Sequence, residues 1–542
     1  MKNKKFSYID TLPAFKNEPL ANFAKNKDEF QKFLSAIRSV RSQLGKKYPL
    51  YIDNEEVFTN TTFQSVNPNN PSEIIGNLTN VDLSNVSAAI AAAKNAFPAW
   101  RNTSAQERAH YLLEVAKVAR SRIYELSAWQ ILEVGKQWDQ AYADVCEAID
   151  FLEYYARETL RLAEPRQLES IPGELNTYFY EPRGIAVVIA PWNFPLAISL
   201  GMVAAAIVTG NTVIYKPSEL SPVVGFNLTQ LFRPVGLPSG VFNYLTGDGP
   251  TIGGALVEHP DVSLIAFTGS KKTGLHICQK AATLYPNQPY VKRVICEMGG
   301  KNAIIVDETA DIDEAIPSIL HSAFAYQGQK CSACSRLIVL DAVYDQCVSR
   351  LVETAKTLTI GPSEDPSNFF GALIDKKAQE KVTSYIEIGK KEASLLYQSP
   401  TPEIPGFFVP LTIFNNALPS HRIAQEEVFG PLLVILRAKN FSHAIDLANS
   451  TEFALTGSVF SRTPSHLQKA SQEFRVGNLY LNRGCTGAIV GRQPFGGFRM
   501  SGGGTKAGGP DYLLHFLDPR TVTENTLRRG FQGNSSFSFT TN

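Results

Sequence analysis

The sequence has few of the features that are typical of proteins that bind nucleic acids, membranes or metal ions. Its 542 residues include 52 Lys and Arg and 51 Asp and Glu, which leaves a net charge of +1. A charge so close to zero argues against nucleic acid or an anionic membrane as the main partner, because both select basic surfaces. Only eight histidines are present and they are isolated from one another. No nucleic-acid or membrane partner is therefore expected.

The sequence also lacks a secretory signal and an uninterrupted membrane span. The first thirty residues have neither the apolar core nor the small-residue cleavage site of a signal peptide. Residues 184–215 carry no charged side chain, but Pro191, Asn193 and Pro195, and later Gly210-Asn211, interrupt the roughly 20 apolar residues that a spanning helix needs. The seven cysteines are odd in number and scattered, which suits free thiols in a reducing compartment. We therefore expect a cytoplasmic protein.

The pattern of apolar residues predicts the fold class. A chain of this length is too long for one hydrophobic core, so at least two domains are expected. The charge-free segment predicts a buried strand at 186–190, a tight turn, a buried helix and a second buried strand at 213–215, as in a parallel sheet covered by helices. Strands and helices alternate up to Glu297 and again after Lys301. The prediction is an α/β protein with two doubly wound parallel-sheet domains.

Composition and periodicity also divide the chain into parts. The segment "IPGELNTYFYEPRG" has the turn residues and alternating aromatics of a β-hairpin, which we interpret as an oligomerisation arm. The polar, Gly- and Ser-rich end of the chain predicts a flexible tail. The predicted parts are an N-terminal arm (1–48), a first α/β domain (49–170 and 185–297), a second α/β domain (298–505), the oligomerisation arm (171–184 and 515–530) and the tail (531–542).

Two short strings indicate a nucleotide cofactor in the first domain. In "IAFTGSKKTG" a strand runs through Gly269 and Ser270 into a helix that contains Gly274, and helix N-termini stabilise phosphates. In "IYKPSE" Lys216 and Glu219 follow another strand, at the edge where open α/β sheets bind ligands. An acidic group there can hold a ribose diol and would repel a 2′-phosphate, which favours NAD over NADP. An ordinary βα turn and a solvated Lys/Glu pair would give the same strings.

The pair Cys331 and Cys334 in "GQKCSACSR" allows several chemistries. A zinc site needs about four ligands, and no second Cys-x-x-Cys or His-x-x-x-His occurs, so no metal is expected. A thioredoxin-like redox pair would belong to a smaller fold. A nucleophilic thiol remains. A Cys–His hydrolase using His321 stays open, although the two residues lie ten apart on what is read as one helix.

Two further polar residues have the setting of catalytic groups. Glu297 ends an apolar strand directly before Met298-Gly299-Gly300, where burial would raise the pKa of its carboxyl, as a general base requires. Asn193 in "APWNFP" lies in a rigid turn between prolines, and its side-chain amide suits an oxyanion hole. A glutamate at a strand end is also common for structural reasons.

Six motifs taken together are far more specific than any one of them. "PWNFP", "KPSE", "FTGS", "EMGGKN", "GQKC" and "EEVFGP" occur in the order and spacing of the aldehyde dehydrogenase superfamily, which the chain resembles from about Pro13 to Asn525. Within it, "GQKCSACSR", "RGCTGAIVGRQPFGGF" and "KAGGPDYL" are similar to the L-glutamate γ-semialdehyde dehydrogenases of proline catabolism. The glycine run 502–504 departs from the family pattern and puts the order of that loop in doubt.

The resemblance implies an NAD-dependent thiol mechanism. Cys331 is then the nucleophile that attacks the aldehyde carbon, and Cys334 is a bystander on the next helical turn. The Asn193 amide and the Cys331 backbone N–H hold the oxyanion, and hydride passes to the nicotinamide. Glu297 then activates the water that hydrolyses the thioester to glutamate.

The resemblance also implies two sets of binding residues. The residues expected at the cofactor are Trp192, Lys216, Glu219, Gly269, Ser270, Gly274, Glu427 and Phe429. The residues expected at the substrate are Glu147, Phe194, Ser332, Gly487, Ala488 and Phe495. In the second set, the backbone amides of Gly487 and Ala488 bind the carboxylate of the substrate, and the Ser332 hydroxyl assists them. The rings of Phe194 and Phe495 line its aliphatic stem. Glu147 assists its ammonium group.

Alternatives and partners follow from the same comparison. Another aldehyde or semialdehyde dehydrogenase on this scaffold is the closest alternative, and a non-catalytic structural homologue is the second. The arm implies a homodimer or a higher homo-oligomer. The same module occurs fused behind a proline dehydrogenase domain, but the residues before about 48 are too few for its FAD-binding barrel. A proline dehydrogenase would therefore be a separate partner.

Overall fold

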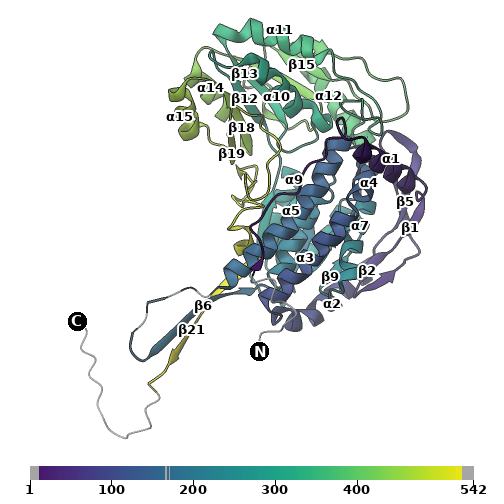
Figure 1. The fold of residues 1–542 in the computed structure, drawn as a ribbon, viewed down its shortest axis with the longest axis vertical. Helices are drawn as coiled ribbons and strands as arrows, with labels where there is room; N and C mark the ends of the chain where they lie inside the picture. Colours follow the sequence, from purple (N-terminus) through teal and green to yellow (C-terminus); the bar gives the residue numbers. More distant parts are fainter. Residues whose placement is uncertain (1–10, 165, 167, 170, 528–542) are drawn as a thin grey trace.

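The computed structural model describes residues 11–164, 166, 168–169 and 171–527. Two lobes are stacked one above the other, each built around a seven-stranded sheet, and a two-stranded arm projects from the lower lobe (Figure 1). The α/β class and the two sheets are as predicted. The predicted tail, 531–542, lies outside the described residues. Within the described part, no helix is both long and apolar enough to cross a membrane.

The first sheet lies in the lower lobe and is mainly parallel. Its neighbouring strands run in the order β11-β10-β7-β8-β9-β2-β3, with the short pair β2/β3 antiparallel at one edge. The bounds are β11 Arg293–Glu297, β10 Val262–Thr268, β7 Ile185–Ile189, β8 Thr212–Lys216, β9 Phe242–Tyr244, β2 Leu50–Ile52 and β3 Glu55–Val57. Strands β7 and β8 are almost completely buried, because helices cover both faces of the sheet and the strand sequences are continuously apolar.

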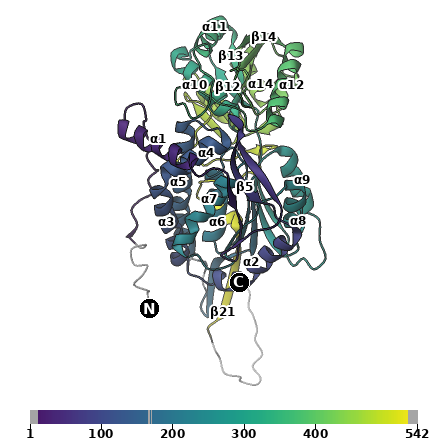
Figure 2. The ribbon, with the colours of Figure 1, turned by 90° about the vertical axis from the view of Figure 1, so that its right-hand side faces the viewer.

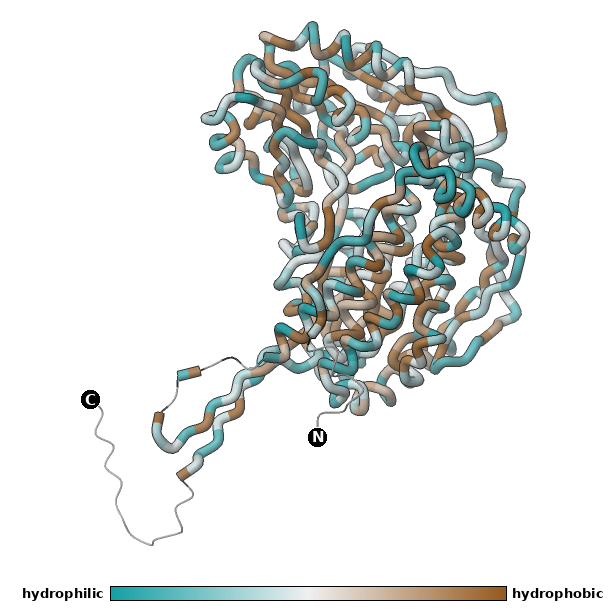
Figure 3. The backbone as a smooth tube through the Cα atoms, viewed as in Figure 1, coloured by the Kyte–Doolittle hydropathy of each residue, from teal (hydrophilic) through white to brown (hydrophobic). Residues whose placement is uncertain are grey.

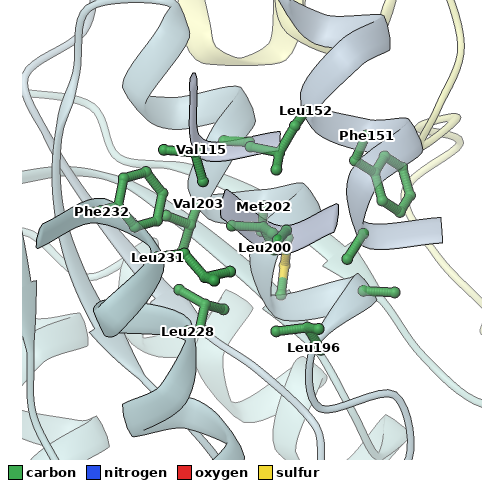
Figure 4. Packing of buried hydrophobic residues seen from close by; sticks show 14 of the residues in the cluster. Val115, Phe151, Leu152, Leu196, Leu200, Met202, Val203, Leu228, Leu231 and Phe232 are labelled. Atoms are coloured by element: carbon green, nitrogen blue, oxygen red, sulfur yellow. The ribbon is translucent and has the colours of Figure 1, made fainter. Parts of the chain in front are cut away.

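Helix α6, Ala197–Val208, explains the charge-free run seen in the sequence. Eleven of its twelve residues are buried, so it is apolar on every side. Leu200, Met202 and Val203 pack among side chains that include Phe151 and Leu152, as Figure 4 shows. The other helices of this lobe are α2 Leu83–Arg101, α3 Ala105–Ser121, α4 Ile123–Val134, α5 Trp138–Ala163, α7 Pro222–Phe232, α8 Gly254–Glu258 and α9 Lys271–Ala281.

The second sheet forms the upper lobe. Its strand order is β14-β15-β16-β13-β12-β18-β19, and only β14 is antiparallel to its neighbour. The strands are β12 Asn302–Val306, β13 Cys334–Leu340, β14 Ser394–Gln398, β15 Thr412–Asn415, β16 Leu432–Ala438, β18 Thr456–Phe460 and β19 Asn478–Leu481. The helices are α10 Ile312–Phe324, α11 Tyr344–Ala355, α12 Lys376–Glu392, α13 Arg422–Gln425, α14 Phe441–Asn449 and α15 Pro464–Glu473.

The N-terminal segment is part of the first lobe rather than a separate arm. Helix α1, Lys27–Arg41, begins at Asn26, whose side chain accepts the amides of Asp28 and Glu29. Its buried face joins the main hydrophobic cluster of the lobe. Figure 2 shows this helix against the side of the lobe, next to α4. A three-stranded sheet, β1 Lys46–Tyr48, β5 Asn70–Thr79 and β4 Thr62–Asn67, follows it.

The predicted local hairpin in residues 171–184 is wrong. That segment forms a single strand, β6 Glu174–Pro182, which pairs antiparallel with β21 Leu517–Asn525 near the other end of the chain. Hydrophobic and hydrophilic residues alternate along the projecting arm (Figure 3). Alternation identifies a strand but not its partner, because period-two patterning is the same whichever strand lies alongside. The arm is therefore closed by a contact more than 300 residues apart in sequence.

We expect Leu200→Ala to lower the free energy of unfolding of the first lobe by about 2–5 kcal/mol, because it leaves a cavity in a fully buried helix. Denaturant titration followed by tryptophan fluorescence measures the change. Leu284→Ala is the matched control, since Leu284 is 77% exposed and should change stability little. Equal effects of the two substitutions would contradict the packing described for α6.

Candidate active site

Cys331 lies in a short loop between α10 and β13. After α10 ends, Tyr326, Gln327 and Gly328 all have positive φ, and this left-handed run turns the chain sharply. A Cβ at Gly328 would approach the Gly430 carbonyl oxygen to 2.5 Å, so the turn needs glycine. The continuous helix expected through this region is therefore wrong, and Cys334 opens strand β13 rather than occupying the next helical turn.

Asn302 fixes the loop from the neighbouring strand. Its side-chain amide donates to the carbonyls of Cys331 at 2.7 Å and Ala333 at 2.9 Å. Its side-chain oxygen accepts the Thr456 amide at 3.0 Å. One buried asparagine thus ties the loop to two strands. Sequence reasoning had no role for this residue, although it ends the motif "EMGGKN".

The two glycines of that motif make room for the site. A Cβ at Gly300 would come within 2.6 Å of the Cys331 carbonyl oxygen. A Cβ at Gly299 would come within 2.2 Å of the Glu427 carboxylate. The Gly300 amide donates to Glu427 at 2.9 Å. Bare backbone is therefore required at both positions, because side chains would displace the loop or the carboxylate.

Glu297 ends β11 and is held by the loop whose order the sequence put in doubt. The Thr505 hydroxyl donates to its carboxylate at 2.5 Å, and the Gly497 amide donates at 3.3 Å. The Gly503 amide donates to the carbonyl of Cys296 at 3.1 Å. The glycine run is thus tied to β11 by hydrogen bonds. A Cβ at Gly502 would approach the Glu297 carboxylate to 2.9 Å, which accounts for a small residue there.

Both reactive groups are protonated at neutral pH in this structure. Burial raises the pKa of Glu297 to about 8, against the lowering effect of the Thr505 and Gly497 hydrogen bonds. Burial, with the nearby carboxylates of Glu427 and Glu297, raises the pKa of Cys331 to about 12. The thiol is therefore a weak nucleophile until a positive charge or a proton acceptor favours its thiolate.

Asn193 lies buried beside the cysteine loop. Its side-chain amide donates to the Gln329 carbonyl at 3.0 Å, two residues before Cys331. This bond uses one of the two N–H groups of the amide and fixes its orientation, so that the other remains to bind a ligand atom. Cys331 lines two cavities, and the other two residues predicted to be catalytic each line one of them: Glu297 the first and Asn193 the second.

The inner cavity has a volume of about 110 Å³ and includes Cys331 and Glu297. All six residues predicted at the substrate line it, namely Glu147, Phe194, Ser332, Gly487, Ala488 and Phe495. Sequence reasoning missed the aromatic wall that Phe151, Tyr155 and Tyr512 add. These rings belong to helix α5 and to the C-terminal part of the first lobe.

The outer cavity, about 480 Å³, lies at the carboxyl edge of the first sheet. Seven of the eight residues predicted at the cofactor line it: Trp192, Lys216, Glu219, Gly269, Ser270, Glu427 and Phe429. Gly274 does not. Its missing side chain instead lets α9 approach Cys296 and Met298, since a Cβ there would come within 2.7 Å of both sulfur atoms.

The outer cavity fits a dinucleotide by its donors and its shape. Ser270 caps α9, an eleven-residue helix whose first turn opens onto the cavity, which favours a phosphate. Glu219 lines the cavity, where its carboxylate can bind a ribose diol. On the same wall, a Cβ added at Gly249 would have no atom within 4 Å, so the wall is open at that point. Trp192 and Phe429 face each other edge to face at 5.6 Å near the cysteine end.

His321 is not part of this arrangement. It lines a third cavity of about 910 Å³ together with Glu147 and Ser332, and Cys331 is not among the residues of that wall. Burial and the positive charge of Lys330 lower the pKa of His321, so it stays neutral. The structure therefore gives no support to a Cys–His pair.

A family comparison agrees with this geometry. The model of the aldehyde dehydrogenase family matches residues 55–522. The chain belongs to the aldehyde dehydrogenase family. One curated relative, 1-pyrroline-5-carboxylate dehydrogenase of Geobacillus kaustophilus (strain HTA426), is 47% identical over 510 residues, which are 94% of this chain and 99% of that protein.

Two solved structures of the family are also similar. 1-Pyrroline-5-carboxylate dehydrogenase from Thermus with bound NAD superimposes with a TM-score of 0.94 at 46% identity, covering 95% of this chain and all of that one. Proline utilization A from Bdellovibrio bacteriovorus superimposes with a TM-score of 0.94 at 47% identity and covers 96% of this chain. This chain spans 54% of that longer protein.

We expect Asn302→Ala to lower the free energy of unfolding by about 1–3 kcal/mol and to loosen the Cys331 loop, because two buried carbonyls lose their donor. Denaturant titration and the rate of Cys331 alkylation by iodoacetamide measure the two effects. The exposed Asn70 provides a control, Asn70→Ala, with little change expected. An alkylation rate unchanged by Asn302→Ala would show that the loop is held by other contacts.

Proposed function

We propose that this protein is an NAD-dependent dehydrogenase of L-glutamate γ-semialdehyde, the open form of 1-pyrroline-5-carboxylate, which it oxidises to L-glutamate in proline catabolism. The observation that carries the proposal is the position of Cys331 at the junction of the two cavities, with its neighbour Ser332 on the inner wall. A thiol placed there reaches an aldehyde from one side and a nicotinamide from the other. The names of the similar proteins support the same reaction.

Cys331 is the nucleophile in this proposal. Its thiolate adds to the aldehyde carbon and forms a thiohemiacetal whose oxygen becomes an anion. The free N–H of Asn193 and the backbone N–H of Cys331 donate to this oxygen, in the manner of an oxyanion hole. Because burial raises the pKa of the thiol to about 12, the proposed reaction requires that bound ligands or a proton acceptor favour the thiolate.

Bound NAD supplies the acceptor for the hydride that leaves the thiohemiacetal carbon. Lys216 and Glu219 hold the adenosine ribose in this proposal, and Ser270 with the start of α9 holds the pyrophosphate. Glu427 binds the nicotinamide ribose and is itself oriented by the Gly300 amide. The carboxylate of Glu219 disfavours a 2′-phosphate by charge repulsion, which selects NAD over NADP.

Glu297 completes the cycle as a general base. Loss of hydride leaves a thioester on Cys331, and water must be deprotonated to attack its carbonyl carbon. A carboxylate with a pKa of about 8 takes that proton more readily than an ordinary glutamate would. The C–S bond then breaks, and Cys331 leaves as the product carboxylate forms. The overall balance is aldehyde, water and NAD⁺ to carboxylate, NADH and two protons.

The inner cavity is suited to an α-amino acid head group. The amides of Gly487 and Ala488 and the Ser332 hydroxyl bind the carboxylate, because small residues leave backbone N–H groups open. The carboxyl of Glu147 faces the ammonium group. Phe194 and Phe495 enclose the aliphatic stem. A simple aliphatic aldehyde would leave the polar groups of this wall without partners, which disfavours its binding.

We further infer how the parts of the chain are used. The lobe of residues 49–170 and 185–297 binds the cofactor, and the lobe of 298–505 carries the nucleophile. The arm formed by β6 and β21 pairs with a second copy of the chain, because in the described part of the chain the outer edges of this two-stranded sheet have a single recorded bridge, Arg166 to Tyr178. The seven free cysteines support a cytoplasmic location. A separate proline dehydrogenase would supply the substrate.

We expect Cys331→Ala to abolish NADH formation from glutamate semialdehyde, with a loss of at least about a thousandfold, because no other group forms the acyl intermediate. Absorbance at the NADH band measures the rate. Cys334→Ala is the control: this buried cysteine opens β13 and its loss should leave most of the activity. Activity that survives Cys331→Ala would end the thiol mechanism, and an inactive parent protein would favour a non-catalytic homologue.

We expect the hydrolysis of the acyl-enzyme to rise with pH through about 8. Glu297 has a raised pKa, so its basic form is scarce well below pH 8 and predominates above it. An activated ester acylates Cys331 without hydride transfer, and its steady-state turnover reports deacylation. Glu297→Gln should slow this step and flatten its pH profile. A parent profile that is flat between pH 6 and 9 would remove Glu297 from the role of base.

A further inference from the structure

The first described residues form an extended strap, defined here as residues 13–23, along helix α5. Figure 1 shows this dark purple segment beside the helix. Arg157 of the helix donates to the Pro13 carbonyl at 3.1 Å, and Phe15 meets Tyr154 edge to face at 5.2 Å. Phe23 packs against the ring of Trp138 at 5.8 Å. The strap is therefore held along the whole helix by specific contacts.

Within the strap, Asn17 bridges two elements of the chain. Its side-chain amide donates to the carboxylate of Asp150 on α5 at 2.8 Å and to the carbonyl of Val490 at 2.9 Å. The backbone amide of Glu18 donates to the other oxygen of Asp150 at 2.7 Å. Both N–H groups of Asn17 are used, one by helix α5 and the other by the loop that contains Val490.

The two elements that Asn17 joins each contribute residues to the proposed substrate site. Asp150 lies three residues after Glu147 on α5, so the two carboxyls share one face of the helix. Val490 lies two residues after Ala488 in the loop that offers its amides to the cavity. Asn17, Asp150 and Val490 line the third cavity together with Glu147 and Ala488. Asn17 thus connects the helix that carries the proposed ammonium contact with the loop that carries the proposed carboxylate contact.

The loop around Val490 is held mainly by hydrogen bonds within itself and by burial of the Val490 side chain. The Gly491 amide donates to the Gly508 carbonyl at 2.9 Å, and the Ile489 amide donates to the Gln493 side chain at 3.2 Å. For the Val490 carbonyl, Asn17 is the one protein donor recorded within residues 11–527 that the structure describes. Gly491 has positive φ, and a Cβ there would come within 3.0 Å of Phe15, so the strap also packs directly on the loop.

We propose that Asn17 is a positioning residue that sets the separation between the carboxylate-binding loop and Glu147, and thereby the preference for substrates with an α-amino acid head. The inference rests on the proposed function, because it assigns the two ends of the cavity to the two charges of the semialdehyde. Asn17 itself touches neither the reacting atoms nor the cofactor. Its effect is on the binding of the head group and not on the chemical step.

The test compares glutamate semialdehyde with butanal, which has the aldehyde but no charged head. With Asn17→Ala, KM for the semialdehyde should rise roughly 3- to 10-fold, as expected for one lost hydrogen bond and a loosened loop. Its kcat should stay within about twofold, and KM for butanal should not change. Steady-state NADH formation gives all four constants. This split separates head-group positioning from a general loss of folded enzyme.

Two variants control for the structural role of the strap. Glu18→Gln removes the ion pair of Glu18 with Arg120 at 2.9 Å and leaves both hydrogen bonds of the Asn17 side chain in place, so KM should not change. The double variant N17D/D150N exchanges the amide and the carboxylate between the two positions. A hydrogen bond between the strap and α5 can still form, but the Val490 carbonyl lacks its donor. The thermal stability of the double variant should return toward the parent while KM for the semialdehyde stays raised.

Three outcomes would overturn the inference. Equal rises of KM for both aldehydes would show that Asn17 supports the fold in general. An unchanged KM for the semialdehyde in Asn17→Ala would show that the loop is held without it. Recovery of KM in N17D/D150N would place the effect in the strap–helix contact alone. A parent protein that oxidises butanal but not the semialdehyde would instead refute the proposed function, which is a separate result.

Discussion

The site depends on how short the crossing between the two sheets is. Strand β11 of the first sheet ends at Glu297 and strand β12 of the second begins at Asn302, so only residues 298–301 separate them. At about 3.5 Å per residue these four residues can span little more than 15 Å. The carboxyl edge of one sheet is therefore fixed against the start of the other. Glu297, Asn302 and the Cys331 loop lie close together because the connection through residues 298–301 is too short to let the two sheet edges separate.

This constraint also explains why the crossing is rich in glycine. Two bare backbone positions lie against the Cys331 carbonyl and the Glu427 carboxylate, and both contacts would be lost if side chains intervened. Burial at the crossing then sets the protonation states. A thiol and a carboxylic acid that both stay neutral at pH 7 can share a small apolar space without the repulsion or the desolvation cost of two anions. The resting site is thus uncharged at its centre and becomes ionised only for reaction.

Local sequence pattern was enough for the parts of the fold that are built locally. Buried strands such as Ile185–Ile189 and the apolar helix after the "PWNFP" turn follow from composition and breakers, and the structure has them within one or two residues. The motif strings also predicted six of the residues that line the inner cavity, although the catalytic roles of Cys331, Glu297 and Asn193 stay predictions. Pattern fails where the partner is distant. The strand at 174–182 looked like half of a hairpin, although its partner is β21. Asn302 binds the Cys331 loop and Thr505 binds Glu297, and neither contact is indicated by a repeating pattern of apolar residues. Gly274 was expected at the cofactor, but it allows close packing of α9 instead.

The contact between Asn17 and Val490 joins residues 473 positions apart. At 5–20 residues per second, a ribosome needs roughly 20 to 100 seconds between synthesising the first of these and the second. Helix α5 is synthesised long before Val490, so residues 13–23 can pack on this helix before the loop around Val490 exists. The loop that would bind the amino acid, at Gly487 and Ala488, is synthesised more than 300 residues after α5 ends. Gly487 follows Cys331 by 156 positions, so a nascent chain carries the thiol for roughly 8 to 30 seconds before the loop proposed to bind the substrate head group is made.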